Sequence, residues 1–590
     1  MKQLKFIGGY IKKHIWSYVG GIMTLFVVDY LNLFIPKLTG TITDGLAGHT
    51  MGMPEVMTNV LKILGIGAIL MLGRFLWRYF LFGVARKIQY ELRNDMFAHL
   101  ENMSVEYYNE HKTGDLMSRF INDLNAIRMT IGPAVISAFD ASVMAIMVIA
   151  QMIYYVNIRL TLLAIIPMFL IAAGELYYGG IMHKRYLATQ EALSGLTDQV
   201  QESFSGVRVI KAFVQEEAEK QAFAKANALT RKKNLNVVRM QAIVMPLLDV
   251  VIGASSLITL LYGGYLALTG EITLGRFVAF NQYIGMLVWP MLAAGDSITT
   301  ISQGMASCKR IQVILEEEPE IADGENVKEA GVIKGSITFD HLTFIHQGHS
   351  EPTLKDLCLE VPAGTTLAVI GRTGNGKSTL VNLLLHLYNT QPGMIRIDGR
   401  DINSIPLKEL RENIAYVPQD NFLFSDTLKH NIAFGVEDEE HEIALEQVEE
   451  VARAACVHDN IIAFPDGYDT IVGERGVTLS GGQKQRSSIA RALLKHAPIL
   501  ILDDALSAVD TDTEKQILEN LKKNSAGRTT ILIAHRISTI QHADNIIVLE
   551  DGEIKEQGNH EQLMALDGIY REMFEKQQLE AGRAESEVWA

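Results

Sequence analysis

The stretch that decides the fold of one half of this chain is Thr366-Leu-Ala-Val-Ile-Gly-Arg-Thr-Gly-Asn-Gly-Lys-Ser-Thr379. Its first five residues predict a buried strand, and the apolar run Leu380–Leu387 predicts a helix after the glycine-rich segment. A strand, a glycine-rich loop and a helix in this order are the context of a phosphate-binding loop. The loop amides and the helix N-terminus both favour bound phosphate, so this half of the chain is expected to bind a nucleotide.

The loop residues have distinct expected roles. Lys377 can reach the β- and γ-phosphates, and the Ser378 hydroxyl can bind Mg²⁺. Glycines let the backbone curl around the phosphates. The expected nucleotide contacts therefore cover the whole loop: Gly371, Arg372, Thr373, Gly374, Asn375, Gly376, Lys377, Ser378 and Thr379.

Two further segments belong with this loop. The apolar run Ile499-Leu-Ile-Leu502 ends in Asp503, a carboxylate that can hold Mg²⁺ through its waters. Between the loop and that run stands Leu479-Ser-Gly-Gly-Gln483, followed by Lys484–Arg491. Taken alone, Ser-Gly-Gly indicates a loop and a helix cap. At this distance before an Asp that ends an apolar run, it is a highly specific companion of a phosphate-binding loop.

The composition separates this half from the first 312 residues. Hydrophobic residues make up 48% and charged residues 21% of the 590 residues, and the mean hydropathy is +0.14. These values indicate a membrane half joined to a water-soluble half and exclude disorder, collagen and a disulfide scaffold. The net charge of −15 argues against a nucleic-acid partner. The three scattered cysteines (Cys308, Cys358 and Cys456) have no metal-ligand spacing and are interpreted as buried or inert thiols.

The first 312 residues are expected to form a transmembrane domain. Residues 1–14 are basic and amphipathic, as in a helix that lies at the cytoplasmic interface. Six apolar segments of spanning length follow, near 17–38, 60–82, 132–156, 159–180, 243–268 and 275–300. Long polar, helix-forming connections at about 86–130 and 184–240 carry many Lys and Arg residues, whereas 39–60 and 268–274 carry none. The positive-inside rule therefore places both connections and both termini in the cytoplasm.

Several ionisable residues fall inside the apolar segments, namely Asp29, Arg74, Arg78, Asp140, Glu175, Asp249 and Asp296. On this topology Asp140, Glu175, Asp249 and Asp296 lie toward the cytoplasmic side. One interpretation is an acidic inner vestibule that favours cationic substrates. The alternative is that these residues pair between helices, or are wet where the helices extend past the lipid.

The motifs together identify a family resemblance. Leu479–Gln483, with Gly371–Thr379 and Asp503, resembles the ATP-binding cassette signature, and nearly the whole chain resembles an ABC exporter half-transporter. The resemblance implies a membrane all-α six-helix exporter domain (1–312), a linker (313–333), an α/β P-loop ABC ATPase domain (334–577) and a tail (578–590). Two such chains would make the working unit, with each ATP held between one chain's phosphate loop and the other chain's signature.

The resemblance also implies roles for further residues. Gln419 would be the Q-loop residue that reads the γ-phosphate and helps to hold Mg²⁺ with Ser378 and Asp503, and His535 would be the switch histidine. Gly473–Gly476 would form the X-loop and Ser507–Asp510 the D-loop. The signature residues Ser480, Gly481, Gly482 and Gln483 would complete the partner's site. Turns near Tyr107–Gly114 and Ser205–Ala212 would couple the ATPase to the membrane domain.

Two positions depart from the family pattern. The residue after Asp503 should be the glutamate that polarises the attacking water, but it is Asp504. Its side chain is one methylene shorter, which displaces the carboxylate by about 1 Å, and a misplacement of that size can cost on the order of 10²-fold in rate. At the position where an aromatic residue usually stacks on adenine, His346 stands instead. The intact signature would still serve the partner.

These features predict one subunit of a bacterial heterodimeric multidrug exporter in the plasma membrane, which would use ATP and Mg²⁺ to move lipophilic, often cationic compounds out of the cell. The other interpretations are a homodimeric lipid flippase, which should have intact catalytic residues at both sites, and an ATP-gated channel or regulatory subunit. Concentrative, ATP-dependent movement against a gradient would exclude the channel.

Overall fold

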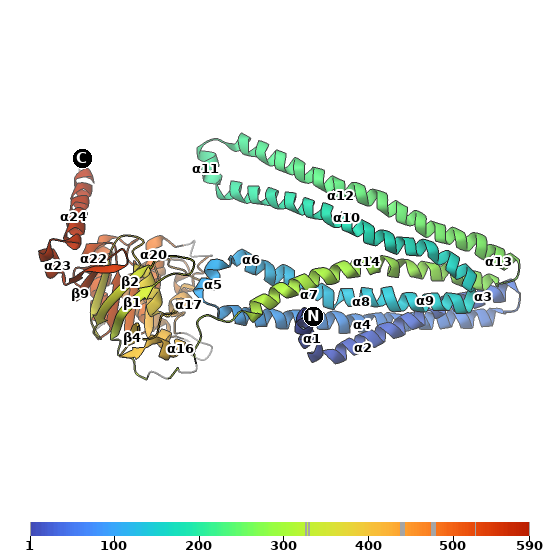
Figure 1. The fold of residues 1–590 in the computed structure, drawn as a ribbon, viewed down its shortest axis with the longest axis horizontal. Helices are drawn as coiled ribbons and strands as arrows, with labels where there is room; N and C mark the ends of the chain where they lie inside the picture. Colours follow the sequence, from blue (N-terminus) through green and yellow to red (C-terminus); the bar gives the residue numbers. More distant parts are fainter. Residues whose placement is uncertain are drawn as a thin grey trace. The chain divides into compact units, whose positions relative to one another are not determined.

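The structure is a computed structural model and describes residues 2–588 except 325–326, 329–330, 437–442, 474–478 and 525–526 (Figure 1). The side chains of 2–4, 171–172, 175–176, 183, 524 and 580–588 are also left aside. The fold consists of two compact units. One contains Met1–Asn102 and His111–Glu318, and the other contains Met103–Glu110 and Pro319–Ala590.

The first unit is helical throughout. Its elements are α1 (Lys2–Lys13), α2 (Ile15–Asn32), α3 (Phe34–Ala47), α4 (Met53–Glu101), α6 (Thr113–Ser118), η1 (Arg119–Asp123), α7 (Leu124–Ile131), α8 (Pro133–Phe139), η2 (Asp140–Met144), α9 (Ala145–Gln151), η3 (Met152–Val156), α10 (Ile158–Ser205), α11 (Val207–Ala212), α12 (Glu216–Ile258), η4 (Thr259–Gly263), α13 (Gly264–Leu268) and α14 (Leu274–Glu316). The four η elements are single π-helical turns within longer helices.

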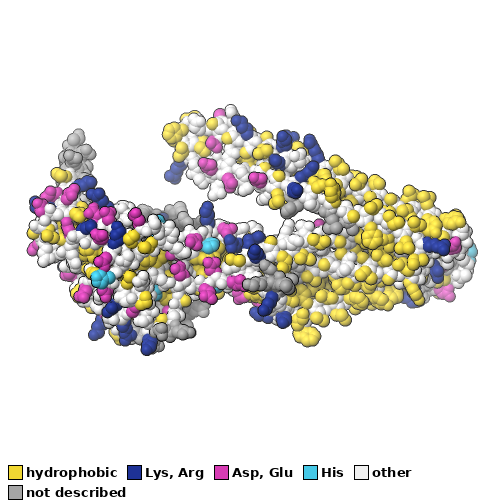
Figure 2. All heavy atoms as spheres, viewed as in Figure 1, with side chains coloured by type: hydrophobic (Ala, Val, Ile, Leu, Met, Phe, Trp, Pro, Cys, Tyr) yellow, Lys and Arg dark blue, Asp and Glu magenta, His cyan; other side chains and the backbone are white. Residues whose placement is uncertain are grey.

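The six expected spanning segments all fall on helices. Five stretches of the described chain are long and apolar enough to cross a membrane: Ile15–Ala47, Met53–Glu101, Thr113–Val156, Glu216–Leu268 and Leu274–Glu316. The fourth expected segment lies on α10, where Ile158–Leu170 forms a shorter apolar stretch. Figure 2 shows a broad apolar surface over this part of the unit, with Lys and Arg gathered beyond it on α10 and α12. The first segment is longer than expected, because helix continues to Ala47 where a loop was expected.

Small residues allow close packing in this unit. A Cβ added to Gly275 of α14 would stand 1.9 Å from the Gly40 carbonyl oxygen of α3, so these two backbones touch. Asp44 secures the same contact, because its carboxylate accepts hydrogen bonds from the Gly275 amide and the Thr273 hydroxyl, both at 2.6 Å. The α3–α14 contact is therefore fixed by an absent side chain and a capping carboxylate.

An ion pair joins the long helices nearer their polar ends. Arg310 of α14 donates to both oxygens of Asp123, at 2.9 Å and 2.5 Å, and the Ser307 hydroxyl donates to the same carboxylate at 2.8 Å. The Asp123 carboxylate is buried, and these hydrogen bonds satisfy both of its oxygens. The amphipathic helix α1 is anchored similarly, because Tyr10 donates to Asp95 of α4 at 2.6 Å.

The second unit is an α/β domain. Its elements are α5 (Val105–Glu110), β1 (Ile337–Phe344), β2 (Leu354–Val361), β3 (Thr366–Ile370), α15 (Lys377–Leu384), β4 (Ile395–Ile397), β5 (Arg400–Asp401), η5 (Ile402–Ser404), α16 (Leu407–Glu412), β6 (Ile414–Val417), α17 (Leu428–Ala433), α18 (Leu445–Ala454), α19 (His458–Ile462), η6 (Gly467–Asp469), α20 (Gly481–Leu494), β7 (Ile499–Asp503), α21 (Thr511–Asn524), β8 (Thr529–Ile533), α22 (Ile537–Ile540), β9 (Asn545–Glu550), β10 (Glu553–Gly558), α23 (His560–Leu566) and α24 (Ile569–Val588).

Two sheets organise this unit. A six-stranded sheet has the order β10-β9-β3-β8-β7-β6, and all neighbours from β9 to β6 are parallel. A four-stranded antiparallel sheet has the order β2-β1-β4-β5. The predicted strand 366–370 matches β3, and the predicted helix begins three residues earlier than expected, at Lys377. One apolar core lies between the two sheets, and another joins the six-stranded sheet to α17, α18 and α20.

Candidate nucleotide-binding site

The expected catalytic residues meet at one edge of the six-stranded sheet. Parallel strands β3, β8, β7 and β6 are neighbours, with Val369 paired to Ile533, Asp503 to Ile533 and Val417 to Leu502. The residues that follow these strand ends are the glycine loop, His535, Asp504 and Gln419. Because the carboxyl ends of neighbouring parallel strands share an edge, residues far apart in sequence converge there. The fold thus assembles a site that the sequence lists in four separate pieces.

The glycine loop after β3 has the tight geometry that a phosphate cradle requires. Gly376, the N-cap of α15, has φ 89°, in the left-handed region, and a Cβ there would stand 2.9 Å from the Thr353 carbonyl oxygen. A Cβ at Gly371 would stand 2.2 Å from the carbonyl oxygen of Leu549. The loop therefore packs backbone against backbone, which leaves its amides available around a ligand. Asn375 fastens it by donating to Leu549 at 2.9 Å.

Lys377 lies buried within this loop. Its Nζ donates to the carbonyl oxygens of Gly371 at 2.8 Å and Arg372 at 2.9 Å. Burial lowers the pKa of Lys377, and the charges of Asp503 and Asp504 oppose that shift. A buried ammonium whose described hydrogen bonds go to neutral carbonyls gains from an added anion, so the loop is electrostatically suited to phosphate.

Asp503 is the residue best suited to hold a metal ion through water. It ends β7 with only 2% of its surface exposed, and the Ser378 hydroxyl hydrogen-bonds to it. Burial raises the pKa of Asp503; the Ser378 hydrogen bond lowers it, the charge of Asp504 raises it further, and Lys377 and His535 act to lower it. A buried carboxylate that is costly to ionise is stabilised by a divalent cation. The donor chemistry of the Ser378–Asp503 pair is therefore compatible with Mg²⁺.

Asp504 begins the loop after β7 in an unusual backbone conformation. Its φ is 48°, which most side chains avoid but Asp tolerates. Its amide donates to the Ile533 carbonyl oxygen at 2.9 Å, which ties it to β8. A cavity of about 220 Å³ is lined by Asp504 together with His535 and Glu514. The structure thus places the expected base and the switch histidine around the same space.

The loop that carries His535 is held from two sides. Gln577 of α24 donates to the His535 carbonyl oxygen at 2.7 Å and accepts from the Ile537 amide at 2.8 Å. Arg536 pairs with the buried Glu514 at 2.9 Å, and Thr539 also hydrogen-bonds to Glu514. The imidazole itself is exposed. Neither Gln577 nor Glu514 belongs to a sequence motif, and both act through tertiary contacts that the sequence does not indicate.

Gln419 follows β6 through Pro418 and is exposed. Its strand pairs with β7, so Gln419 and Asp503 leave adjacent strand ends. Its backbone carbonyl accepts from Asn421 at 3.3 Å. This position at the sheet edge suits a residue that reaches a ligand rather than one that supports the core.

His346 lies beside the glycine loop, at the end of the hairpin formed by β1 and β2. Its Nε2 is 3.3 Å from the Thr379 hydroxyl, and its ring meets Phe344 and Tyr388 edge to face at 4.8 Å and 5.2 Å. Burial lowers the pKa of His346; Glu106 of α5 raises it and His349 lowers it. A neutral imidazole contacting the loop can stack on a purine, although its area is smaller than that of tyrosine.

The signature forms the exposed start of helix α20. Ser480 is its N-cap: the Ser480 hydroxyl accepts from the Gln483 amide at 3.3 Å, and Gln483 accepts from the Ser480 amide at 2.9 Å. This reciprocal pair orders the N-terminus and leaves Gly481 and Gly482 with free approach to an anion. α20 packs with α17 and α18, whereas the glycine loop belongs to the sheet edge.

Gln485 links this helix to Asp504, a connection the sequence analysis missed. Its side-chain oxygen accepts from the Ala508 amide at 2.9 Å, and its nitrogen donates to the Ser507 hydroxyl at 3.1 Å and the Asp504 carbonyl oxygen at 3.4 Å. Gln485 is buried. The sequence carried no signal for these contacts, because the burial of Gln485 and its partners 19 to 23 residues away emerge only in the fold. Of the X-loop, Glu474–Gly476 lie outside the described residues.

Comparisons with known proteins agree with this geometry. The family profile described as "ABC transporter transmembrane region" matches residues 18–291, and the profile described as "ABC transporter" matches 354–507. Among solved structures, "Structure of a bacterial Atm1-family ABC exporter with ATP bound" matches with a TM-score of 0.78 and 28% identity, covering 96% of this chain and 98% of that one.

Three curated relatives match over most of their length. The probable multidrug resistance ABC transporter ATP-binding/permease protein YheI of Bacillus subtilis is 38% identical, with 98% of each chain covered. The multidrug resistance-like ATP-binding protein MdlA of Escherichia coli is 38% identical over 97% of this chain and 96% of that protein. The ATP-dependent lipid A-core flippase of Syntrophus aciditrophicus is 38% identical over 84% of this chain and 81% of its own.

Proposed function

This chain belongs to the ABC transporter family, as a membrane helical domain fused to an ABC ATPase, and on that premise we propose that it is the degenerate-site subunit of a heterodimeric exporter. Its own phosphate loop would hold ATP while turning it over slowly. Its signature would complete the rapid site of a partner chain. The observation that carries the proposal is Asp504 beside an intact, capped Ser480–Gln483 segment.

The chain's own site would bind ATP through residues already at the sheet edge. Lys377 would exchange its hydrogen bonds to the carbonyl oxygens of Gly371 and Arg372 for contacts with the phosphates. The amides of Gly371–Thr379 would surround those phosphates. Ser378, Asp503 and Gln419 would hold Mg²⁺, which would supply charge neutralisation on the phosphate oxygens. His346 would lie against the adenine.

Asp504 is the reason to expect slow turnover at this site. The left-handed backbone and the hydrogen bond to Ile533 fix the start of its side chain, so the backbone has little freedom to move the carboxylate forward. A shorter side chain on a fixed backbone leaves the general base about 1 Å or more short of a glutamate position. ATP would then remain bound for long periods.

The signature segment, Ser480–Gln483, would instead support rapid turnover, at the partner's site. Its N-terminus is exposed, ordered by its own capping box and free of charged side chains at 480–483. An ordered helix start of this kind binds an anion presented by another molecule. The partner chain, with a glutamate at the position equivalent to 504, would therefore contain the site that turns over.

Two short cytoplasmic helices would transmit closure of the ATPase domains to the membrane helices. Helix α5 lies in the same compact unit as the ATPase, and its Glu106 interacts electrostatically with His346. Helix α11 lies in the membrane unit, and its neighbourhood exposes Val207, Val209 and Phe213. An exposed apolar turn on a long cytoplasmic hairpin suits docking onto the partner's ATPase domain. Both termini and the ATPase domain would be cytoplasmic, with the chain in the plasma membrane.

The membrane unit favours a cationic, lipophilic substrate. Asp29 of α2 has 6% of its surface exposed, and its Oδ2 has no hydrogen-bond partner among the described residues. Asp140, at the start of the π-helical turn η2, also has an unpartnered Oδ1 within that part of the chain, and the two carboxylates interact electrostatically, with Arg74 nearby. Two under-satisfied acids inside a membrane bundle would be neutralised by a bound cation. Of the other proposed vestibule acids, Asp249 and Asp296 are exposed, and the side chain of Glu175 lies outside the described residues.

A homodimeric lipid flippase is the second candidate, because a relative named as a lipid A-core flippase is 38% identical over 84% of this chain. Such a homodimer would place Asp504 in both of its sites, so both would be slow. Asp504 therefore favours the heterodimer.

The deciding experiment measures ATP binding and steady-state ATPase activity of this chain alone in lipid nanodiscs, and then with a glutamate-bearing half-transporter. We expect ATP binding with negligible turnover alone, and rapid turnover with the partner. Robust turnover by the chain alone would contradict the degenerate-site proposal and favour the flippase. Uptake of a lipophilic cation into inside-out vesicles, compared between wild type and the Asp140→Asn variant, tests the substrate class.

A further inference from the structure

The hairpin formed by β1 and β2 contains two bulges, one on each strand. Phe339 pairs with Leu359 and Leu342 with Leu357, which leaves two residues on β1 opposite one on β2. Phe344, the next paired residue on β1, lies opposite Leu354. Between this pair and the Leu342–Leu357 pair, two residues on β2 lie opposite one on β1. The residues His341 and Asp356, one in each bulge, have φ of 48° and 51°. Bulges of this kind redirect side chains and often occur next to functional sites.

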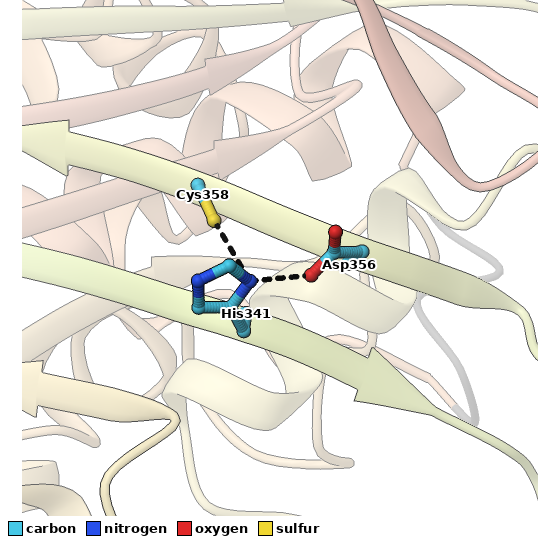
Figure 3. Close-up of side chains that lie close together, drawn as sticks. All are labelled: His341, Asp356 and Cys358. Carbon is cyan, nitrogen blue, oxygen red and sulfur yellow. Dashed lines mark hydrogen bonds and ion pairs between the residues drawn. The ribbon is translucent and has the colours of Figure 1, made fainter.

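The paired bulges bring three side chains together on the outer face. Leu342 and Leu357 point into the core, whereas His341, Asp356 and Cys358 are all exposed. His341 Nδ1 lies 2.6 Å from Asp356 Oδ1 and 3.6 Å from Cys358 Sγ, as Figure 3 shows. One donor atom from each residue lies within 4.8 Å of the other two.

We propose that His341, Asp356 and Cys358 form a binding site for a divalent transition metal ion, of which Zn²⁺ is the best match. The donors are an imidazole nitrogen, a carboxylate oxygen and a thiolate sulfur, a mixture typical of zinc and unlike the all-oxygen sites of Mg²⁺ or Ca²⁺. Water would supply the fourth ligand. This site is separate from the nucleotide-binding residues and does not depend on the proposed transport function.

The two distances from His341 Nδ1 can be compared with those around a tetrahedral ion. With zinc–nitrogen and zinc–sulfur bonds of about 2.0 and 2.3 Å, tetrahedral geometry separates the nitrogen and sulfur by about 3.5 Å, close to the observed separation of 3.6 Å. The nitrogen and oxygen would separate to about 3.4 Å, so Asp356 must withdraw from its present 2.6 Å contact. Its side chain is 74% exposed and can rotate into solvent. The same exposure gives the ion an entry path.

A nucleophilic role for Cys358 does not fit the geometry. In a Cys–His–carboxylate relay the thiol and the carboxylate contact opposite nitrogens of the imidazole. Here Asp356 and Cys358 both lie against Nδ1 of His341. The three groups converge on one point instead of forming a chain, which is the arrangement of ligands around an ion.

The test uses the full chain, purified in nanodiscs without a polyhistidine tag and stripped with chelator, and titrated with Co²⁺ as a spectroscopic substitute for Zn²⁺. We expect a saturable thiolate-to-cobalt absorption band with one ion per chain, which Zn²⁺ abolishes. Cys358→Ser should remove the band, and His341→Ala should weaken binding by about tenfold or more. Cys456→Ser, which changes the other cysteine that is not buried, is the matched control and should behave as wild type.

Two outcomes would overturn the site. One is a wild-type chain with no saturable thiolate band, and the other is a band that survives Cys358→Ser but is lost in Cys456→Ser. Nucleotide binding measured in parallel shows that each variant is folded, because none of these three residues contacts the glycine loop. A failure of the exporter proposal would leave this titration unaffected, so the two results can be separated.

Discussion

The sheet edge that follows β3 and β7 and the N-terminus of α20 contrast sharply within one ATPase domain. The sheet edge is held by hydrogen bonds to buried strands, and its one departure from the family pattern, Asp504, lies on a constrained backbone. The start of α20 is exposed, is ordered by the reciprocal hydrogen bonds between Ser480 and Gln483, and is unaltered in sequence. Under the proposed function, this contrast would let the chain lose turnover at the site it builds while keeping the surface it offers to another chain.

The largest expected effect on ATPase activity appears when a substitution at the start of α20 is compared with one in the glycine loop. In the assembled pair, Gly481→Asp should reduce steady-state ATPase activity by about 10²–10³-fold, because a negative charge would replace a helix-start anion site. Lys377→Ala should reduce it far less. Among the described residues, a Cβ at Gly481 would meet nothing nearer than the Ala508 Cβ at 3.7 Å, an ordinary van der Waals contact. Equal losses in the two variants would break the assignment of the active site to the partner.

Lengthening the carboxylate should repair the chain's own site. Asp504→Glu should raise single-turnover hydrolysis at this site by about 10–100-fold, because the oxygen returns to the position of a general base. In the pair, steady-state activity should rise by about twofold as a second site joins the first. Rapid quench with radiolabelled ATP bound to this chain measures the first quantity. An unchanged rate would mean that geometry at 504 does not limit this site.

His346→Tyr should tighten ATP binding by about tenfold through a larger stacking area, with His349→Tyr as the control. The pH dependence sharpens the test. Burial lowers the pKa of His346, so the ring is neutral at pH 7 and protonation on acidification disfavours its packed position. Wild-type ATP affinity should therefore fall as the pH drops below about 6.5, the ordinary histidine value. The tyrosine variant should show no such decline in equilibrium titrations.

The smallest effect concerns the support of the switch histidine. In an Asp504→Glu background, Gln577→Ala should slow single-turnover hydrolysis by about threefold, because it removes hydrogen bonds to His535 and Ile537 that are each worth about 1 kcal/mol. The exposed neighbour Gln578 provides the control, Gln578→Ala. If both variants behave alike, α24 does not position His535.

Much of the site could be predicted from the sequence, because phosphate binding requires local patterns. The strand at 366–370, the glycine loop and Asp503 each depend on residues a few positions apart, and the structure places them as expected. A membrane half fused to a water-soluble half followed from the composition shift, and the ATPase assignment followed from the motifs. The contacts of Gln485, Gln577 and Glu514 could not be predicted, because each joins segments separated by between 19 and 42 residues.

The cysteines show the same limit more clearly. Their wide spacing in the sequence indicated inert thiols, but the structure leaves Cys358 exposed and its neighbour across the hairpin is His341. Only strand pairing with two bulges brings these residues together, and no spacing rule in a single strand encodes it. Likewise, the length of the first membrane helix was underestimated because Thr and Gly residues near 39–45 weaken the apolar signal while α3 continues to Ala47.

The contacts of Gln485 would couple nucleotide binding at the start of α20 to nucleotide binding at the Asp504 edge. Its side chain connects the helix that would receive the partner's nucleotide to the carbonyl of Asp504 and the amide of Ala508. Linkage is reciprocal, so a nucleotide that tilts α20 must alter affinity at the Asp504 edge by the factor with which that edge alters affinity at α20. One glutamine would therefore let a slow site record whether its faster neighbour is loaded, and the slow site would act as a memory within each transport cycle.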